Sequence, residues 1–159
     1  MKHLFILYIL ILFSCNTNNK KTIHTTKQNP IEIDAIKKTL SFQQECWNNG
    51  DLDGFMEGYW NSEGLVFTSL KYKPAYGWEE IRRRYQESYP TKSSMGELNF
   101  EILDLKIISK TTANLKGKWK LTREKDSLNG LFWLDLKKFD ENWLITKDST
   151  ISFEIKKPY

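Results

Sequence analysis

Apolar and polar residues alternate along most of the chain after Gly96, and this period of two constrains the fold more than any other feature. Residues 113–122 alternate apolar side chains with lysine and other polar side chains, as in a strand with one buried face. Further strands are expected over residues 131–139 and 143–155. The second half of the chain therefore predicts a meander of long antiparallel strands.

Within the first of these strands, the alternation changes phase. Leu98, Phe100 and Ile102 share one face, whereas Leu103 and Leu105 continue with the opposite parity. Such a slip predicts a β-bulge or a sharp bend, because the extra residue moves every later side chain to the other face. A bend of this kind curls a sheet around a cavity.

Helical spacing dominates the chain before this sheet. A long helix is expected over residues 30–48, where proline occupies the first helical position behind an asparagine cap. A short helix over residues 52–59, a strand over residues 65–70 and a third helix over residues 78–89 follow. Helices first and long strands afterwards predict an α+β domain.

The first fifteen residues resemble a bacterial lipoprotein signal. Lys2 and His3 precede an apolar run that is too short to span a bilayer. The run ends in LFSC, so Cys15 is expected to be the lipidated residue, with an ordinary signal peptide as the alternative. Because Asn16 follows the cysteine, similarity to other lipoproteins favours the outer membrane, with the protein facing the periplasm.

The residues that follow the predicted signal divide into a tether and a domain. Residues 16–29 are polar and predict a flexible tether. The expected organisation is therefore a signal over residues 1–15, a tether over residues 16–29 and one domain over residues 30–159. The expected partners are a small-molecule ligand and the membrane, which is reached through the lipid anchor.

The composition excludes several chemistries. Both histidines, His3 and His24, precede the domain, so it has no imidazole base for nucleophilic catalysis and no His-ligated metal site. Cys46 remains as a lone cysteine, which excludes an internal disulfide, and no cofactor or metal is expected. The net charge of +4 is mild and argues against a nucleic-acid partner.

Several short motifs, taken in their order along the chain, resemble one known family. They include GDLDGFMEGYW over residues 50–60, Gly77-Trp78 and the last strand from Trp143 to Asp148. Over residues 33–153 the chain is similar to the nuclear transport factor 2-like, SnoaL-like superfamily, in a bacterial branch of unknown function. The resemblance implies a cone-shaped, curved antiparallel sheet packed with three N-terminal helices, an internal pocket, and a homodimer formed through the sheet.

Two aspartates are the candidate catalytic residues. Relatives commonly carry Asp-His-Thr/Ser in the last strand, whereas this chain has Asp148-Ser149-Thr150, which argues against any His-dependent activity. Superfamily isomerases use a carboxylate in an apolar cavity, a role open to Asp148 or Asp135. The alternatives are a structural carboxylate for Asp148 and a solvent-facing side chain for Asp135. We expect neither pKa to be raised enough for catalysis.

Six Trp, seven Tyr and nine Phe supply enough rings for a dense core and a lined cavity. Tyrosines in this set are candidates to donate to a substrate oxygen, with bonded core hydroxyls as the alternative. The expected ligand-binding residues are Tyr59, Trp60, Trp78, Tyr85, Tyr89 and Trp119.

The favoured function is an envelope lipoprotein whose pocket binds a small apolar or aromatic molecule without catalysis. The alternative is an enzyme of the ketosteroid isomerase or SnoaL cyclase kind, in which a carboxylate and tyrosines transfer a proton. A third possibility is an association module that uses its sheet as a dimer surface. The orientation of the two aspartates distinguishes the first two hypotheses.

Overall fold

The computed structural model describes residues 29–153, within which the chain forms four helices and six strands. The predicted signal, Cys15 and all but the last residue of the predicted tether lie outside this range. The helices are α1 (Pro30–Asn49), α2 (Leu52–Met56), α3 (Trp78–Ser88) and α4 (Lys92–Met95). The strands are β1 (Val66–Ser69), β2 (Ala75–Tyr76), β3 (Glu97–Ile107), β4 (Thr112–Thr122), β5 (Ser127–Phe139) and β6 (Asn142–Phe153).

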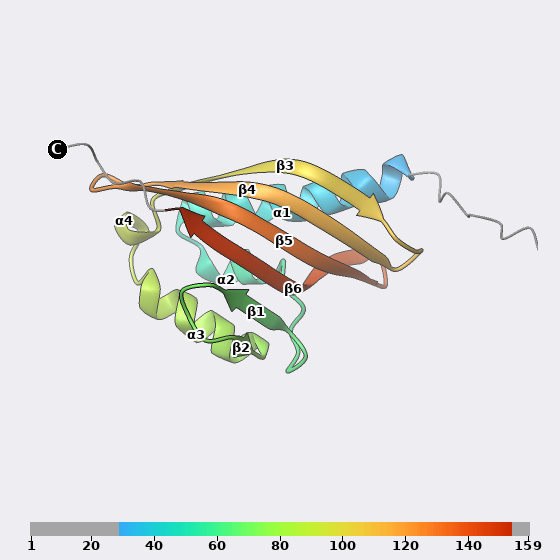
Figure 1. Cartoon of the computed structure of the whole chain (residues 1–159), viewed down its shortest axis with the longest axis horizontal. Helices are drawn as coiled ribbons and strands as arrows, with labels where there is room; N and C mark the ends of the chain where they lie inside the picture. Colours follow the sequence, from blue (N-terminus) through green and yellow to red (C-terminus); the bar gives the residue numbers. More distant parts are fainter. Residues whose placement is uncertain (1–28, 154–159) are drawn as a thin grey trace, which may run out of the picture.

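All six strands form one sheet in the order β2-β1-β6-β5-β4-β3 (Figure 1). β3 to β6 are long and pair antiparallel, as the alternation predicts. β1 instead runs parallel to β6, with Phe67 beside Asp148, so the sheet is not antiparallel throughout. The two strands are joined by most of the domain rather than by a hairpin, and a long connection permits parallel pairing.

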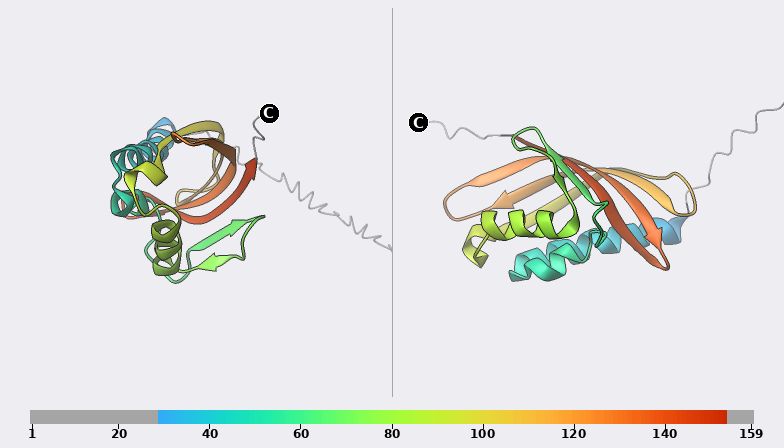
Figure 2. Two further views of the ribbon diagram at one scale, coloured as in Figure 1. Left: turned by 90° about the vertical axis from the view of Figure 1, so that its left-hand side faces the viewer. Right: turned by 90° about the horizontal axis from the view of Figure 1, so that it is seen from below.

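The long strands curl around the interior. Seen end-on, β3 to β6 form an arc with α1 on its concave side, and α3 lies near the open edge with β1 and β2 (Figure 2). The register shifts between Ile102 and Asp104, so the predicted bulge is confirmed. The α+β fold with helices packed on a curved sheet is also confirmed, and α4 adds a short turn to the three predicted helices.

Local chemistry sets the ends of the first two helices. The Asn29 side chain accepts a hydrogen bond from the Ile31 amide at 3.1 Å, and proline follows at the first helical position. Gly50 ends α1 with φ of 80°, a left-handed conformation that favours glycine. Asp51 then caps α2 by accepting from the Gly54 amide at 2.8 Å. This short link directs α2 back beneath the sheet.

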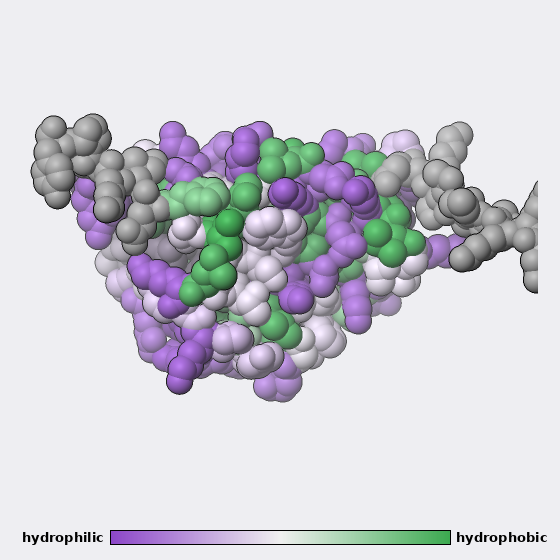
Figure 3. Space-filling view, in the orientation of Figure 1, coloured by the Kyte–Doolittle hydropathy of each residue, from purple (hydrophilic) through white to green (hydrophobic). Residues whose placement is uncertain are grey.

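Apolar packing and polar contacts hold α1 against the sheet. Ile36, Leu40 and Trp47 are buried along one face of the helix. Near its start, Glu32 accepts hydrogen bonds from the Trp143 indole at 2.6 Å and from the Lys138 ammonium at 2.9 Å. On the face of the molecule shown in Figure 3, apolar residues form separate groups among polar ones. Among the described residues, no helix has the length and apolar character needed to cross a membrane.

Candidate functional site

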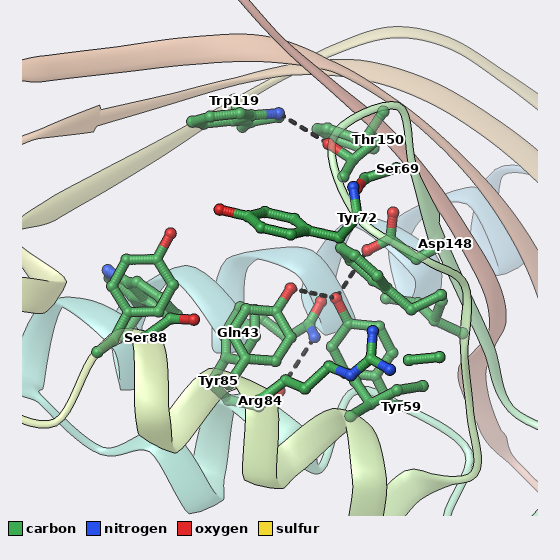
Figure 4. Close-up of a pocket in the computed structure, with 18 of the residues that line it drawn as sticks. Gln43, Tyr59, Ser69, Tyr72, Arg84, Tyr85, Ser88, Trp119, Asp148 and Thr150 are labelled. Carbon is green, nitrogen blue, oxygen red and sulfur yellow. Dashed lines mark hydrogen bonds between the residues drawn. The ribbon is translucent and has the colours of Figure 1, made fainter.

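The concave face of the sheet and the helices enclose a cavity of about 490 Å³ (Figure 4). This volume lies in the range of small-molecule pockets, roughly 300–1,000 Å³. Its walls are predominantly aromatic, and each of six helices and strands contributes one Phe or Trp ring. These rings are Trp47, Phe55, Phe67, Phe100, Trp119 and Phe132.

Asp148 on β6 points into this cavity (Figure 4). The residue is only 6% exposed, and its Oδ2 accepts a hydrogen bond from the Tyr59 hydroxyl at 2.9 Å. Its Oδ1 is buried without a hydrogen-bond partner among the described residues. Burial raises the pKa of Asp148 to about 7, although the Tyr59 hydrogen bond lowers it. Asp148 therefore departs from the expectation that its pKa is not raised enough for catalysis.

A β-bulge explains why this aspartate faces inward. Trp143 and Ile145 point into the core, and simple alternation from them would direct Asp148 outward. The register of β5 and β6 shifts at this point, and Thr146 is the extra residue. The Thr146 hydroxyl donates to the Asp135 carbonyl at 3.1 Å within the bulge. Beyond the bulge the even-numbered residues face the cavity, Asp148 among them.

A short chain of hydroxyls leads to the carboxylate. The Tyr85 and Tyr59 hydroxyl oxygens are 3.4 Å apart. Because the Tyr59 hydrogen is donated to Asp148, Tyr85 is the donor in this second bond. Burial, followed by the neighbouring Asp148, raises the pKa of both tyrosines, so both remain neutral donors at physiological pH.

The roof of the cavity includes Trp119 on β4. Its indole N–H donates to the Thr150 hydroxyl at 3.0 Å, and that hydroxyl donates to the Leu131 carbonyl at 3.2 Å. Gly130 lies beside the indole, and a Cβ at this position would approach the indole nitrogen to 2.7 Å and the Ile151 carbonyl oxygen to 1.8 Å. Glycine is therefore required for this arrangement of Trp119 on the sheet.

Four of the six aromatic residues expected from the sequence line the cavity, namely Tyr59, Tyr85, Tyr89 and Trp119. Trp60 does not, although its neighbour Tyr59 does. Its ring stacks on Phe139 with centroids 5.3 Å apart. Trp78 does not line the cavity either, since its indole N–H bonds to the Met56 carbonyl at the end of α2, at 3.1 Å.

Asp135 lies outside the cavity, on the exposed face of β5. Leu134 and Leu136 on either side of it are buried, so strand alternation turns the aspartate outward. Its carboxylate accepts a hydrogen bond from the Asn114 side chain at 2.6 Å. Asp135 therefore does not share a site with Asp148, which corrects its inclusion among the candidate catalytic residues.

Several lining residues escaped the sequence analysis. Gln43 on α1 is buried, and its amide donates to the Phe55 carbonyl at 3.0 Å. Phe100 and Phe132 face inward, as their strand parity would have indicated.

Among residues 29–153, no three His, Cys, Asp or Glu side chains lie close enough together to hold a metal ion.

Comparisons with known proteins place this geometry in a family. No protein-family model and no curated protein matches the chain. The structure is similar, with a TM-score of 0.73, to an NTF-2-like protein of unknown function from Shewanella oneidensis MR-1, to which the chain is 42% identical over 76% of its own length and 98% of that protein. The chain belongs to the nuclear transport factor 2-like family.

Two further members of this fold show how widely the sequences diverge. This nuclear transport factor 2-like protein is 20% identical to a cystatin-like domain of unknown function from Nostoc punctiforme, with a TM-score of 0.64. The match covers 77% of the present chain and 78% of the Nostoc chain. The protein is also 14% identical to a ketosteroid isomerase-like protein from Erwinia carotovora atroseptica, with a TM-score of 0.66. This match covers 80% of the present chain and all of the Erwinia protein. At these identities the likeness concerns the fold.

Proposed function

We propose that the pocket binds a small, flat, mainly apolar molecule that donates one hydrogen bond to Asp148. The observation that carries this proposal is the unpartnered Oδ1 of Asp148, which is buried in a cavity walled by aromatic rings. A buried carboxylate oxygen without a donor is costly. A ligand hydroxyl or N–H group would satisfy it, while the rings would contact the apolar body of the ligand.

Binding without catalysis agrees best with the hydrogen bonds around the carboxylate. A proton-transfer enzyme needs a base and also a donor to the oxygen on which charge develops. The Tyr59, Tyr85 and Trp119 donors are all used inside the protein. A ligand oxygen would have to displace one of these internal bonds to receive a hydrogen bond from any of these three donors.

Proton transfer of the isomerase type is the second candidate function. It is supported by the pKa of about 7 for Asp148, because a general base is most effective near the operating pH. The likeness to a ketosteroid isomerase-like protein points the same way. Turnover of a steroid enone that disappears in Asp148→Asn but persists in Asp135→Asn would establish this reading.

Native mass spectrometry tests the binding proposal. The full chain, purified from its own cell envelope, is expected to retain a small molecule. Asp148→Asn replaces the unpartnered acceptor and is expected to lose most of this bound mass, whereas Asp135→Asn on the exposed face is the matched control and should retain it. Wild-type protein that carries no such molecule, or equal retention in both variants, contradicts the proposal.

Tyr59→Phe is expected to raise the pKa of Asp148 further, because it removes the hydrogen bond that lowers this pKa. The loss of a bond to a buried carboxylate is also expected to cost about 1–3 kcal/mol in the free energy of unfolding at pH 8. Urea unfolding across a pH series measures both effects. Tyr76→Phe, at an exposed tyrosine, should leave them unchanged, and the same result for Tyr59→Phe would contradict the prediction.

We also propose that the protein is a lipoprotein of the bacterial envelope, held by acyl chains on Cys15. The LFSC sequence after a short apolar run supports this proposal. Cys15→Ala should abolish incorporation of labelled palmitate and move the protein out of the membrane fraction. Cys46→Ala is the control, since this cysteine is buried in the domain, and should leave both readouts unchanged. Palmitate labelling that survives Cys15→Ala would contradict the proposal.

A further inference from the structure

The opening of the pocket differs chemically from its interior. Most of the lining residues that are also exposed lie in the loop between β1 and β2 and on α3, and they mark the opening. The loop contributes Lys71, Tyr72 and Lys73, and the helix contributes Arg83, Glu87 and the half-buried Arg84. Figure 4 shows the Tyr72 ring reaching across the pocket between Trp119 and Tyr85.

The positively charged side chains at this opening differ in whether they form ion pairs with acidic residues. Arg83 pairs with Glu80 and Glu87 of its own helix, and Arg84 pairs with Glu80 at 2.7 Å. The ion pairs found among residues 29–153 include neither lysine of the loop. Two uncompensated ammonium groups therefore remain at the entrance.

The loop that carries these lysines is attached to α3. The Arg84 guanidinium donates to the Lys73 carbonyl at 2.9 Å, in addition to its ion pair with Glu80. Lys71 lies with its ammonium 5.7 Å from the centre of the Tyr72 ring. The bond from Arg84 keeps the loop, with both lysines, beside the pocket opening.

The interior has the opposite electrostatic character. Asp148 is an acid, and an anionic group beside it would be repelled once the aspartate ionises. An anion on a ligand is therefore disfavoured at the inner end of the pocket and favoured at the opening. A hydroxyl or N–H donor is favoured at the inner end, where Oδ1 has no partner.

We propose that the pocket selects amphipathic organic acids that carry a hydrogen-bond donor and a carboxylate at opposite ends of an apolar body. In this arrangement the donor bonds to Asp148, the body contacts the aromatic walls, and the carboxylate lies between Lys71 and Lys73. The inference rests on the proposed function, to which it adds the chemical class of the ligand and its orientation.

Three related naphthalenes test this class and its orientation by isothermal titration calorimetry on the full chain at pH 7.5. 6-Hydroxy-2-naphthoic acid carries both groups at opposite ends, its methyl ester lacks the negative charge, and 2-naphthoic acid lacks the hydroxyl. The hydroxy acid is expected to bind most tightly. Two exposed ion pairs, with Lys71 and Lys73, together correspond to an affinity for the acid about fivefold higher than for the ester.

The variant Lys71→Gln/Lys73→Gln is expected to reduce the affinity for the hydroxy acid to that for the ester, without changing the affinity for the ester. Lys120→Gln/Lys147→Gln on the exposed face of the sheet is the control for a general loss of charge and should have no effect. High salt should weaken binding of the acid alone. Because all four lysines are exposed, both double variants are expected to fold.

The outcomes separate this inference from the function on which it rests. Equal affinities for acid and ester, in wild type and in the loop variant, would overturn the ligand class while leaving an apolar binding pocket in place. The class also fails if both lysine variants weaken acid binding equally, because the attraction would then belong to the overall charge. If none of the three compounds binds, the ligand class and the proposed binding function fail together.

Discussion

The free energy of unfolding of the wild-type protein is expected to fall by up to about 4 kcal/mol between pH 4 and pH 8 because of Asp148, and Asp148→Asn is expected to abolish this fall. Burial raises the pKa of Asp148 in the folded protein to about 7, from an ordinary value of 3.8. Below about pH 4 the residue is protonated whether the chain is folded or unfolded, and it imposes no penalty. As the pH rises towards 7, the unfolded chain ionises while the folded chain retains the proton, so unfolding becomes more favourable.

Above about pH 7 both states are ionised, and the penalty reaches its full value. Asparagine can still accept the Tyr59 hydrogen bond but carries no charge, so the variant should be more stable than wild type at pH 8 and similar to it at pH 4. Urea unfolding at pH 4, 5, 6, 7 and 8 measures the difference. Asp135→Asn is the control and should follow the wild-type curve, since that carboxylate is exposed. The prediction fails if Asp148→Asn follows the wild-type curve as well.

The same cost bears on the proposed ligand binding. In the proposed complex a ligand donor at Oδ1 would stabilise the charged form, so binding should lower the pKa of Asp148 and recover part of the lost stability. A residue that weakens the empty fold and strengthens the occupied one is typical of a functional site rather than of a structural carboxylate.

The sequence predicted much of the architecture because its signals are local. The asparagine cap and Pro30 mark the start of α1, and Gly50 is the expected residue for its left-handed end. The phase change after Ile102 marks the bulge in β3 directly. Each signal involves neighbouring residues, so it can be recognised without knowledge of the tertiary structure.

The site was harder to predict because its decisive features depend on pairing between distant strands. Asp148 faces the cavity only because Thr146 is accommodated as an extra residue opposite β5, and no change in hydrophobic phase announces this bulge in β6. The parallel pairing of β1 with β6 places Phe67 beside Asp148. Neither local sequence predicts this pairing. An exposed Asp135 was one of the two alternatives that strand alternation left open, and the structure places it between two inward-facing leucines.

Trp47→Ala is expected to cost about 3–5 kcal/mol in the free energy of unfolding, a large share of the roughly 5–15 kcal/mol typical of a domain. Trp47 is 3% exposed and makes edge-on contacts with Phe55 and Tyr89, each with ring centroids 4.9 Å apart. Its indole N–H also donates to the Met95 carbonyl at 2.9 Å, so truncation removes that bond together with the packing.

Because Trp47 forms part of the cavity wall, its loss should also merge a new void with the pocket and weaken binding of flat ligands. Trp133→Ala is the matched control, since that ring is 39% exposed on the outer face of the sheet, where Lys116 lies over it. Its truncation should cost about 1 kcal/mol or less. Urea unfolding at pH 5, where little of the Asp148 penalty has developed, compares the two variants directly. Equal losses would mean that Trp47 contributes no more than a surface ring, contrary to its burial and contacts.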